Sequence, residues 1–545
     1  MKRTFILWAM LASSVVLWAQ QLGSTAADDM QHYEGQSCTS IMVGKKASSD
    51  GSVITSHTCD GRYRTWVSIE PAQDHQPGAM HEVRTGTMHT TYREDTTGVK
   101  VVGRIPEAMH TYAYVNTAYP CLNEKQLAMG ETTFGGPDVL KNPKGMFTIE
   151  ELQRIALQRC DNARAAVRLI GRLVQQYGYG DAGECITIAD KNEVWQMEIL
   201  GEGPKKIGGV WAAQRIPDNH VGVSANIPRI GRLQRNNPDY FLCSDNCERV
   251  ARNFNLWDGK GEFLFWKAFN ASYANGKNFR EREFFILNAL APSLHLSMDM
   301  DTLPFSVVPD KNVDVRKVIE LFRSTYEGTD FDMCKNVRTT VKSKNKPTPD
   351  TVVSPVANPW LAGRMQQMLN FIAPGTIEFR RTVSVAWCSY SHVIQLRDWL
   401  PDEVGGVCWF AVDNPGQSPR IPIFAGTTSL PQAFSLCGQK AYEANAIIWK
   451  YRKANKLATV AWQNTKQMMM SEVGKQEDRA FAEVVAVERE VKAMFAHVQT
   501  DEQVANAHRM ATAVLNDATL KVYDRTSDSW RTLEEKLWSY FGMGF

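Results

Sequence analysis

The chain has 545 residues, of which 43% are hydrophobic and 22% charged, and its formal net charge at pH 7 is +2. This composition is ordinary for a globular protein, and the length allows a large core and more than one domain. A net charge so close to zero argues against binding to nucleic acid or to an anionic membrane surface.

The first 20 residues have the features of a signal peptide. A short basic start with Lys2 and Arg3 precedes a nearly unbroken apolar stretch over residues 5–19, which is short for a membrane span. An uncleaved N-terminal anchor is the alternative. No later stretch has the apolar length of a span, so we expect an exported protein, periplasmic or secreted, with no membrane contact after signal removal. The polar residues 21–37 are predicted to be a leader, or otherwise a flexible N-terminus.

A β-hairpin is predicted directly after this leader. Two β-branched and apolar runs, residues 38–44 and 53–60, flank a polar connection that ends in the turn signal Asp50-Gly51. Cys38 is the first residue of the first run. A cut between Ser37 and Cys38 would give that residue both a thiol and an α-amine, whose reference pKa is about 7.7–8.0. Nucleophile and general base would then belong to one residue; the alternative is a buried strand cysteine.

Two helices are predicted after a β-like region with runs at residues 66–69, 99–102 and 113–115. Thr148 and Glu151 have the spacing of a capping box for the first helix, and Asp161 is the expected cap of the second, which stops at residues 177–178. The following residues 178–183 match G-x-G-x-x-G. A dinucleotide site requires a strand before this motif and a helix after it, and here the order is reversed. We therefore predict a helix-to-strand turn.

Strands and helices then alternate in blocks. We expect a hairpin over residues 185–189 and 194–199, whose sheet continues through 210–214 and 221–226. The remaining predictions are helices mainly over 247–300 and over 313–326, an exposed loop over 342–359, strands at 376–379, 382–388 and 406–412, and helices from about 440, including 442–467 and 478–495. This order favours an α+β fold.

Several segments occur together in a pattern typical of one enzyme family. They are the hairpin start at residues 38–44 and the stretches 119–124, 130–133, 291–293, 303–307, 326–329 and 389–397. Over about residues 38–430 the chain resembles the dipeptidase (PepD-type) family of N-terminal-nucleophile cysteine hydrolases. The resemblance implies a four-layer αββα sandwich of the N-terminal-nucleophile hydrolase type. The expected organisation is a signal peptide (1–20), a leader (21–37), a hydrolase domain (38–439) and a helical C-terminal extension (440–545).

The resemblance assigns the nucleophile and its neighbours near the hairpin. Cys38 would attack the peptide carbonyl and would also release its own leader by an N-to-S acyl shift. Asp60 matches the family aspartate that holds the α-ammonium, although it is also a plausible turn residue. His57 stands where the family has an arginine, so His57, Arg62 or Arg64 would take over that role, and we assign His57 to substrate binding.

The resemblance also places site residues outside the hairpin. Asn226 matches the sheet asparagine that steadies the amine or the oxyanion, although an asparagine before Ile-Pro is also a common strand end. Thr133 falls where some relatives carry an oxyanion-hole asparagine, and we assign it to substrate binding. Arg280 is the choice for a family arginine, with Arg282 as its competitor; the structural alternative for both is a surface ion pair.

The expected export affects how the cysteines are interpreted, because an exported protein can oxidise some of them to disulfides. There are eleven, so at least one stays unpaired if all bonds are intramolecular. Cys38 is the expected free thiol, and Cys243 and Cys247 are a candidate local disulfide. Zinc is disfavoured because those two cysteines lack further ligands at a suitable spacing. The mechanism requires no metal and no organic cofactor.

Together these features predict an exported cysteine dipeptidase that acts on short peptides. Two alternatives remain open: the same nucleophile acting on a non-peptide acyl amide, and a non-catalytic binding or secretion-associated relative. The long C-terminal helices are suited to an interface between copies of the chain, so a homo-oligomer is an additional expectation.

Overall fold

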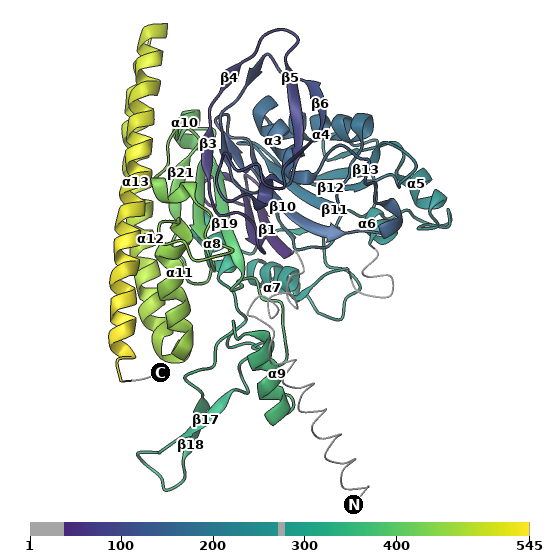
Figure 1. The fold of residues 1–545 in the computed structure, drawn as a ribbon. Coiled ribbons are helices and arrows are strands. Elements are labelled where there is room, and N and C mark those ends of the chain that lie inside the picture. Colours follow the sequence, from purple (N-terminus) through teal and green to yellow (C-terminus); the bar gives the residue numbers. More distant parts are fainter. Residues whose placement is uncertain (1–36, 271–277, 544–545) are drawn as a thin grey trace, which may run out of the picture.

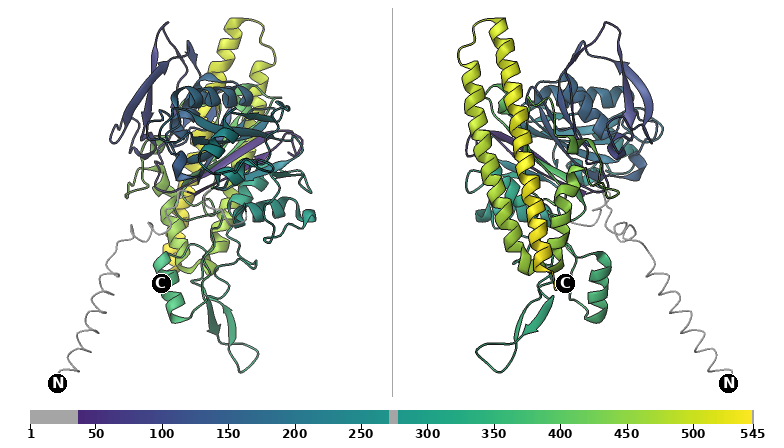
Figure 2. Two further views of the ribbon diagram at one scale, coloured as in Figure 1. Left: turned by 90° about the vertical axis from the view of Figure 1, so that its right-hand side faces the viewer. Right: turned by 60° about the vertical axis from the view of Figure 1, so that its left-hand side comes forward.

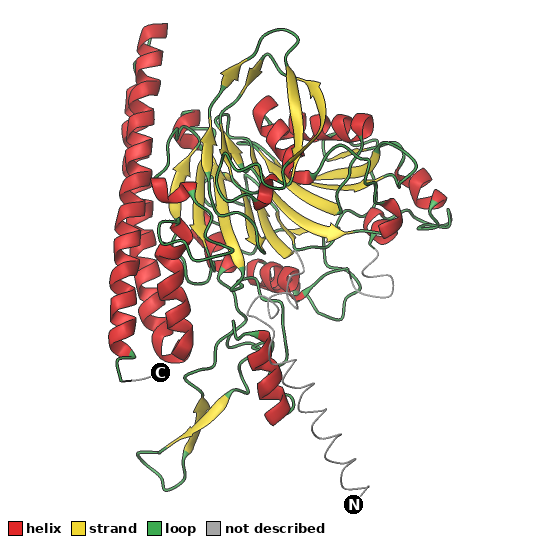
Figure 3. Cartoon of the chain, in the orientation of Figure 1, coloured by secondary structure: helices red, strands yellow, loops and turns green. Residues whose placement is uncertain are grey.

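The computed structural model describes residues 37–270 and 278–543, so the predicted signal peptide and all but the last residue of the leader lie outside the described residues. The fold is mixed α/β with two large antiparallel sheets and three two-stranded ones (Figures 1 and 3), which confirms the α+β prediction. None of the helices in the described part of the chain combines the length and the hydropathy that crossing a bilayer requires.

The predicted hairpin forms the middle of a seven-stranded sheet. Strand β1 (Ser37–Val43) pairs with β2 (Val53–Asp60), with Cys38 opposite Cys59. All residues of both strands are buried, because both faces of the sheet are covered. From edge to edge the order is β16 (Ser306–Val307), β14 (Val221–Ser224), β1, β2, β19 (Cys388–Leu396), β20 (Val407–Val412) and β21 (Ile421–Phe424).

The second large sheet has eight strands and contains the second predicted hairpin. Its order is β15 (Phe241–Cys243), β13 (Gly209–Ile216), β12 (Val194–Gly201), β11 (Gly183–Ala189), β10 (Ala128–Gly135), β9 (Leu122–Asn123), β8 (Tyr114–Asn116) and β3 (Ser68–Glu70). The prediction that residues 221–226 continue this sheet is wrong. Strand β14 crosses to the other sheet, where Ser224 pairs with Ser40 of β1. This crossing brings Asn226 to the start of β1.

The two large sheets pack against each other through β1, β2, β10 and β11. Small polar side chains link them: Thr55 and Thr187 hydroxyls lie 2.7 Å apart, and those of Thr132 and Ser224 lie 2.5 Å apart. Gly130 of β10 allows the close approach, since a Cβ atom there would lie 2.5 Å from the Ser56 carbonyl oxygen. The residue after this glycine, Glu131, therefore reaches the start of β1.

Helices cover the sheets and share their hydrophobic core. Helices α3 (Ile149–Arg159) and α4 (Ala163–Tyr177) contact the eight-stranded sheet, and α11 (Ile447–Ala458), α12 (Trp462–Phe495) and α13 (Asp501–Tyr540) stand side by side against β20 and β21 (Figure 2). Helix α7 (Glu281–Leu290) contacts β14, and α8 (Val315–Phe322) contacts β19. The shorter helices are α5 (Cys247–Asn253), α6 (Phe265–Phe269), α9 (Gly363–Ile372), α10 (Asp402–Gly405) and the 3-10 turns η1 (Thr87–His89), η2 (Asp138–Leu140), η4 (Pro292–Leu294), η5 (Gln432–Ser435) and η6 (Thr459–Ala461).

The helix caps differ from the predicted ones. Thr148 occupies the N-cap position of α3, but its side chain makes no capping hydrogen bond, and the Glu151 side chain pairs with His81 and Arg154. Asn162, and not Asp161, caps α4 by accepting from the Ala165 N–H. Residues 178–183 connect α4 to β11, so the predicted helix-to-strand turn is confirmed.

Three other segments also depart from the predictions. The loop predicted over 342–359 contains β18 (Asp350–Val353), which pairs with β17 (Arg338–Val341) in a projecting hairpin (Figure 1). The strands predicted at 376–379 and 382–388 do not form. That stretch makes scattered hydrogen bonds instead, for example from the Ser384 N–H to the Ser324 carbonyl. The other two-stranded sheets are β4 (Gln73–Asp74) with β7 (His110–Thr111) and β5 (Met80–Thr85) with β6 (Lys100–Pro106).

Candidate active site

Cys38 is fully buried at the start of the central strand, and several residues far away in the sequence contact it. Its backbone N–H, still part of the peptide bond to Ser37, donates to Asn226 Oδ1 at 2.9 Å. Its carbonyl oxygen accepts from Arg282 Nη1 at 2.5 Å. Burial raises the pKa of the Cys38 thiol well above its usual value, and the negative charge of Glu131 adds to this effect. The thiol is therefore protonated in this state of the chain.

Asn226 lies just beyond the end of β14 and is held on several sides. Its φ of 65° lies in the left-handed region, which asparagine tolerates better than most residues. Its side-chain Nδ2 donates to the Thr133 carbonyl at 2.6 Å, and its Oδ1 accepts from Arg282 Nη2 at 2.8 Å. The asparagine predicted from the sequence is thus fixed beside the nitrogen of Cys38.

Arg282, and not Arg280, is the arginine that donates to the Cys38 carbonyl. Arg280 precedes the first turn of α7, where its backbone N–H donates to Glu283, whereas Arg282 is the second residue of the helix and is fully buried. Burial, followed by the charge of Arg381, lowers the pKa of Arg282 to about 9, so it keeps its charge at neutral pH. The prediction of Arg280 is corrected accordingly, because the orientation of α7 turns the second arginine toward β1.

Asp60 lies opposite Ser37 in the β1–β2 ladder and forms a buried ion pair. Its Oδ2 accepts from Arg381 Nη2 at 2.5 Å and from the Thr58 hydroxyl at 3.0 Å. Arg381 also donates to the Ser37 hydroxyl at 2.9 Å and to the Ser37 carbonyl at 3.4 Å. Sequence reasoning missed this arginine. The expected substitute Arg64 instead hydrogen-bonds Asn116 and the Thr117 carbonyl.

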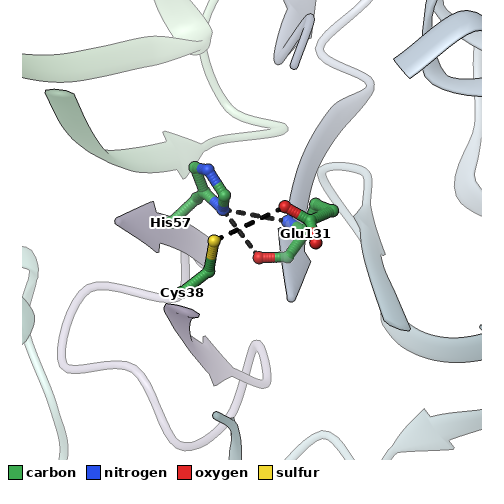
Figure 4. A group of neighbouring side chains, drawn as sticks. All are labelled: Cys38, His57 and Glu131. Carbon is green, nitrogen blue, oxygen red and sulfur yellow. Dashed lines mark hydrogen bonds between the residues drawn. The ribbon is translucent and has the colours of Figure 1, made fainter. Parts of the chain in front are cut away.

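Glu131 is a second residue that sequence reasoning missed, although the segment around it was part of the family pattern. The Cys38 thiol donates to Glu131 Oε2 at 3.6 Å, and the Thr133 hydroxyl donates to Oε1 at 3.0 Å (Figure 4). His57 lies on the other side, with Nδ1 2.7 Å from the Glu131 carbonyl oxygen. Burial lowers the pKa of His57 to about 4, so its ring is neutral near pH 7.

The Cys38 sulfur, a His57 nitrogen and a Glu131 carboxylate oxygen all lie within 4.8 Å of one another, which is compatible with metal ligation. His57 Nδ1 lies 2.7 Å from the Glu131 carbonyl oxygen and 3.1 Å from the Glu131 backbone nitrogen, whose N–H points at it. His57 Nε2 is buried and has no hydrogen-bond partner among the described residues, so the ring keeps one nitrogen lone pair available in its neutral form.

All eleven cysteines are free thiols, so the candidate disulfide between Cys243 and Cys247 is not formed. The Cys243 sulfur accepts from Arg235 Nη1 at 2.9 Å, and the Cys247 sulfur contacts the Ser244 carbonyl at 3.3 Å. Cys38, the expected free thiol, is one of the eleven.

A cavity of about 250 Å³ adjoins the Arg381 side of the site. The residues on either side of Arg381 in the sequence line it, together with Lys456 and a largely apolar set that includes Met333, Trp360, Leu361, Phe379, Val385 and Trp387. The chain thus offers a compact, mainly apolar space whose lining includes both sequence neighbours of Arg381, the arginine that contacts Ser37.

Behind Glu131 lies a series of buried carboxyl groups. Glu184, on β11 opposite Thr133, hydrogen-bonds Glu131 and has a pKa raised well above its usual value by burial and by the Glu131 charge. Burial raises the pKa of Glu131 to about 6 and that of Glu150 to about 8, and it also raises the pKa of Asp181. Between its ordinary pKa and its raised pKa, each of these groups holds a proton in the folded chain that it would release in an unfolded one.

Glu150 makes the stability of the fold depend on pH. Its folded pKa of about 8 exceeds the ordinary 4.5, so the folded state binds more protons, and stability is lost as pH rises through about 8. We expect Glu150→Gln to raise the free energy of unfolding at pH 8.5 by about 3 kcal/mol and to change it little at pH 4.5. Urea unfolding at both pH values measures this. Glu490→Gln on the exposed side of α12 is the control, and equal pH slopes for both variants would contradict the prediction.

Comparison with known proteins adds a family match to this geometry. The model of a family described as peptidase family C69 matches residues 37–475. A probable dipeptidase of Latilactobacillus sakei is 26% identical over 76% of this chain and 79% of its own length. A probable dipeptidase of Salmonella dublin is 25% identical over 71% of this chain and 81% of its own length. A probable dipeptidase B of Lactococcus lactis is 24% identical over 73% of this chain and 76% of its own length.

Proposed function

The chain belongs to peptidase family C69 and is a cysteine-type peptide-bond hydrolase, and from this and the site geometry we propose that it is an exported dipeptidase whose mature form begins at Cys38. The observation that carries the proposal is the set of contacts around one residue. A thiol and the nitrogen that would become an α-amine both belong to Cys38, at the head of a buried central strand.

The contacts of the uncleaved chain support this mechanism. When the Ser37–Cys38 bond is cut, the nitrogen that donates to Asn226 Oδ1 becomes an α-amine, which carries one hydrogen more than the peptide N–H when it is neutral and two more as the ammonium. Asp60 Oδ1 is buried and has no hydrogen-bond partner among the described residues, so it offers an acceptor for this α-ammonium. The amine then takes the thiol proton, the sulfur attacks the substrate carbonyl, and the proton passes to the leaving amine.

The fold and the cavity fit the same proposal. Two facing sheets with helices against each of them match the four-layer αββα arrangement of N-terminal-nucleophile hydrolases. The attacked carbonyl of Ser37 corresponds to that of the first residue of a dipeptide. The cavity of about 250 Å³ lined by the sequence neighbours of Arg381 has the size for one side chain, which favours dipeptides whose first residue is apolar.

N-terminal sequencing and intact mass of the protein from the exported fraction, followed by a dipeptide panel, test the proposal. We expect a start at Cys38, and hydrolysis of Leu- and Phe-first dipeptides at least tenfold faster than that of Lys-first ones, because Lys456 repels a second cation. Cleavage of acyl amides with no dipeptide hydrolysis would favour a non-peptide amidase. A persistent leader with no hydrolysis of either class would favour a binding protein.

A further inference from the structure

We propose that Glu131 and Arg381 catalyse the release of the leader, Glu131 as the base for the Cys38 thiol and Arg381 as the hydrogen-bond donor to the Ser37 carbonyl oxygen. This inference rests on the proposed function, in which the mature chain begins at Cys38. Release of the leader poses a chemical problem that does not arise when the mature enzyme cleaves a substrate. Before cleavage the Cys38 nitrogen is a peptide N–H, which accepts no proton near neutral pH, so the base of the mature enzyme does not yet exist.

Every reacting part of the Ser37–Cys38 unit has a partner in the uncleaved chain. The thiol contacts Glu131 Oε2 at 3.6 Å, and this carboxylate comes from β10 in the facing sheet. The carbonyl oxygen of Ser37 lies 3.4 Å from Arg381 Nη2, which the buried Asp60 holds in place. The peptide N–H points at Asn226 Oδ1 at 2.9 Å. Nucleophile, electrophile and leaving group are thus all contacted by fixed side chains.

Cleavage of the Ser37–Cys38 bond and release of the leader need no reactant other than water. Glu131 accepts the thiol proton while the Cys38 sulfur forms a bond to the Ser37 carbonyl carbon, and Arg381 stabilises the resulting oxyanion. The carbon–nitrogen bond then breaks, and Glu131 returns the proton to the departing nitrogen. The product is a thioester between Ser37 and the Cys38 sulfur, with a free α-amine. Water hydrolyses the thioester and releases the leader with a C-terminal carboxylate.

The electrostatics of the site match this role. Burial keeps the thiol protonated, so a neighbouring acceptor is needed, and burial also brings the pKa of Glu131 to about 6, where a carboxylate still accepts protons near neutral pH. The rate of self-cleavage should therefore rise with pH through about 6. The titratable groups that face Glu131 from the packed elements are Cys38, His57, Tyr63, Tyr119, Tyr179, Asp181 and Glu184.

Pulse-labelled full-length chain, made by cell-free synthesis and chased between pH 5 and 8.5, tests the inference by loss of the leader on gels and in mass spectra. We expect Glu131→Gln to slow cleavage about 100-fold or more and to abolish the rise through pH 6. Arg381→Gln should slow cleavage about 100-fold and leave the pH profile in place. Arg323→Gln, a similarly buried arginine paired with Glu477, is the control with unchanged cleavage.

Conservative variants separate catalysis from folding. Glu131→Asp and Arg381→Lys keep the charge, so partial cleavage in them together with a wild-type thermal midpoint supports the inference. Wild-type cleavage with an unchanged pH profile in Glu131→Gln would overturn it. Leader removal only by an added protease would also overturn it, while dipeptide hydrolysis by the product would leave the proposed function standing. Self-cleavage without hydrolysis of any dipeptide would instead leave the inference standing and contradict the proposed function.

Discussion

Cys38→Ala is expected to abolish dipeptide hydrolysis and to leave the leader attached to the chain. The substitution removes the only atom in the proposed mechanism that bonds to the substrate, and loss of a nucleophile lowers kcat on the order of a million-fold. Removing one buried sulfur costs about 1 kcal/mol of stability, so the variant should remain folded. Intact mass spectrometry, N-terminal sequencing and a dipeptide assay on the purified protein measure the first two effects, and urea unfolding measures the stability.

Cys59→Ala is the matched control for this variant. Cys59 lies directly opposite Cys38 on β2 and is equally buried, so both substitutions remove the same atom from the same layer of the sheet. We expect Cys59→Ala to process its leader and to hydrolyse dipeptides at close to the wild-type rate. Normal turnover by Cys38→Ala would assign the nucleophile to another residue.

Arg282→Gln is expected to have the second-largest effect. The guanidinium of this fully buried residue donates to the Cys38 carbonyl, the Ala225 carbonyl and Asn226 Oδ1. Each of these hydrogen bonds involves a charged donor and contributes about 1.5–3 kcal/mol, and glutamine can replace at most part of them. We expect a loss of about 3–5 kcal/mol in the free energy of unfolding and a fall of at least about 100-fold in kcat, because Asn226 loses a fixed neighbour.

Arg280→Gln provides the comparison for Arg282→Gln within the same segment. Arg280 is partly exposed just before the first turn of α7, and its backbone N–H donates to Glu283. We expect this variant to differ from the wild type by less than about 0.5 kcal/mol in stability and less than threefold in kcat. Urea unfolding and steady-state kinetics on both variants decide between the two arginines, and a larger effect for Arg280 would restore the assignment made from the sequence.

The parts of the site that lie near one another in the sequence were predictable. Alternating β-branched residues and an Asp-Gly turn specify the hairpin that carries Cys38 and Asp60, and both strands form where expected. The motif around Asn226 was assigned by family resemblance, and this residue does contact Cys38. Periodicity also located α4 and the β11–β12 hairpin, because one apolar face or one alternating pattern is enough to define each of them.

The rest of the site depends on tertiary packing. The choice between Arg280 and Arg282 depends on how α7 is rotated against β14, and the local sequence does not fix that rotation. Arg381 reaches Ser37 from a stretch whose β-branched composition predicted strands, but which follows an irregular path. Glu131 belongs to a segment of the family pattern, but the sequence does not show that it faces the thiol, which it reaches only because Gly130 lets two sheets approach closely.

The position of β1 in the middle of its sheet has a consequence for the timing of activation. The side chains around the Ser37–Cys38 bond come from β2, β10, the end of β14, α7 and the stretch that contains Arg381, which lies 344 positions after Ser37. A nascent or truncated chain without these elements holds the cysteine but none of the surrounding groups. In the proposed mechanism, leader release would therefore act as an internal quality check, because a molecule would gain its reactive terminus only after most of its polypeptide has been synthesised and correctly assembled.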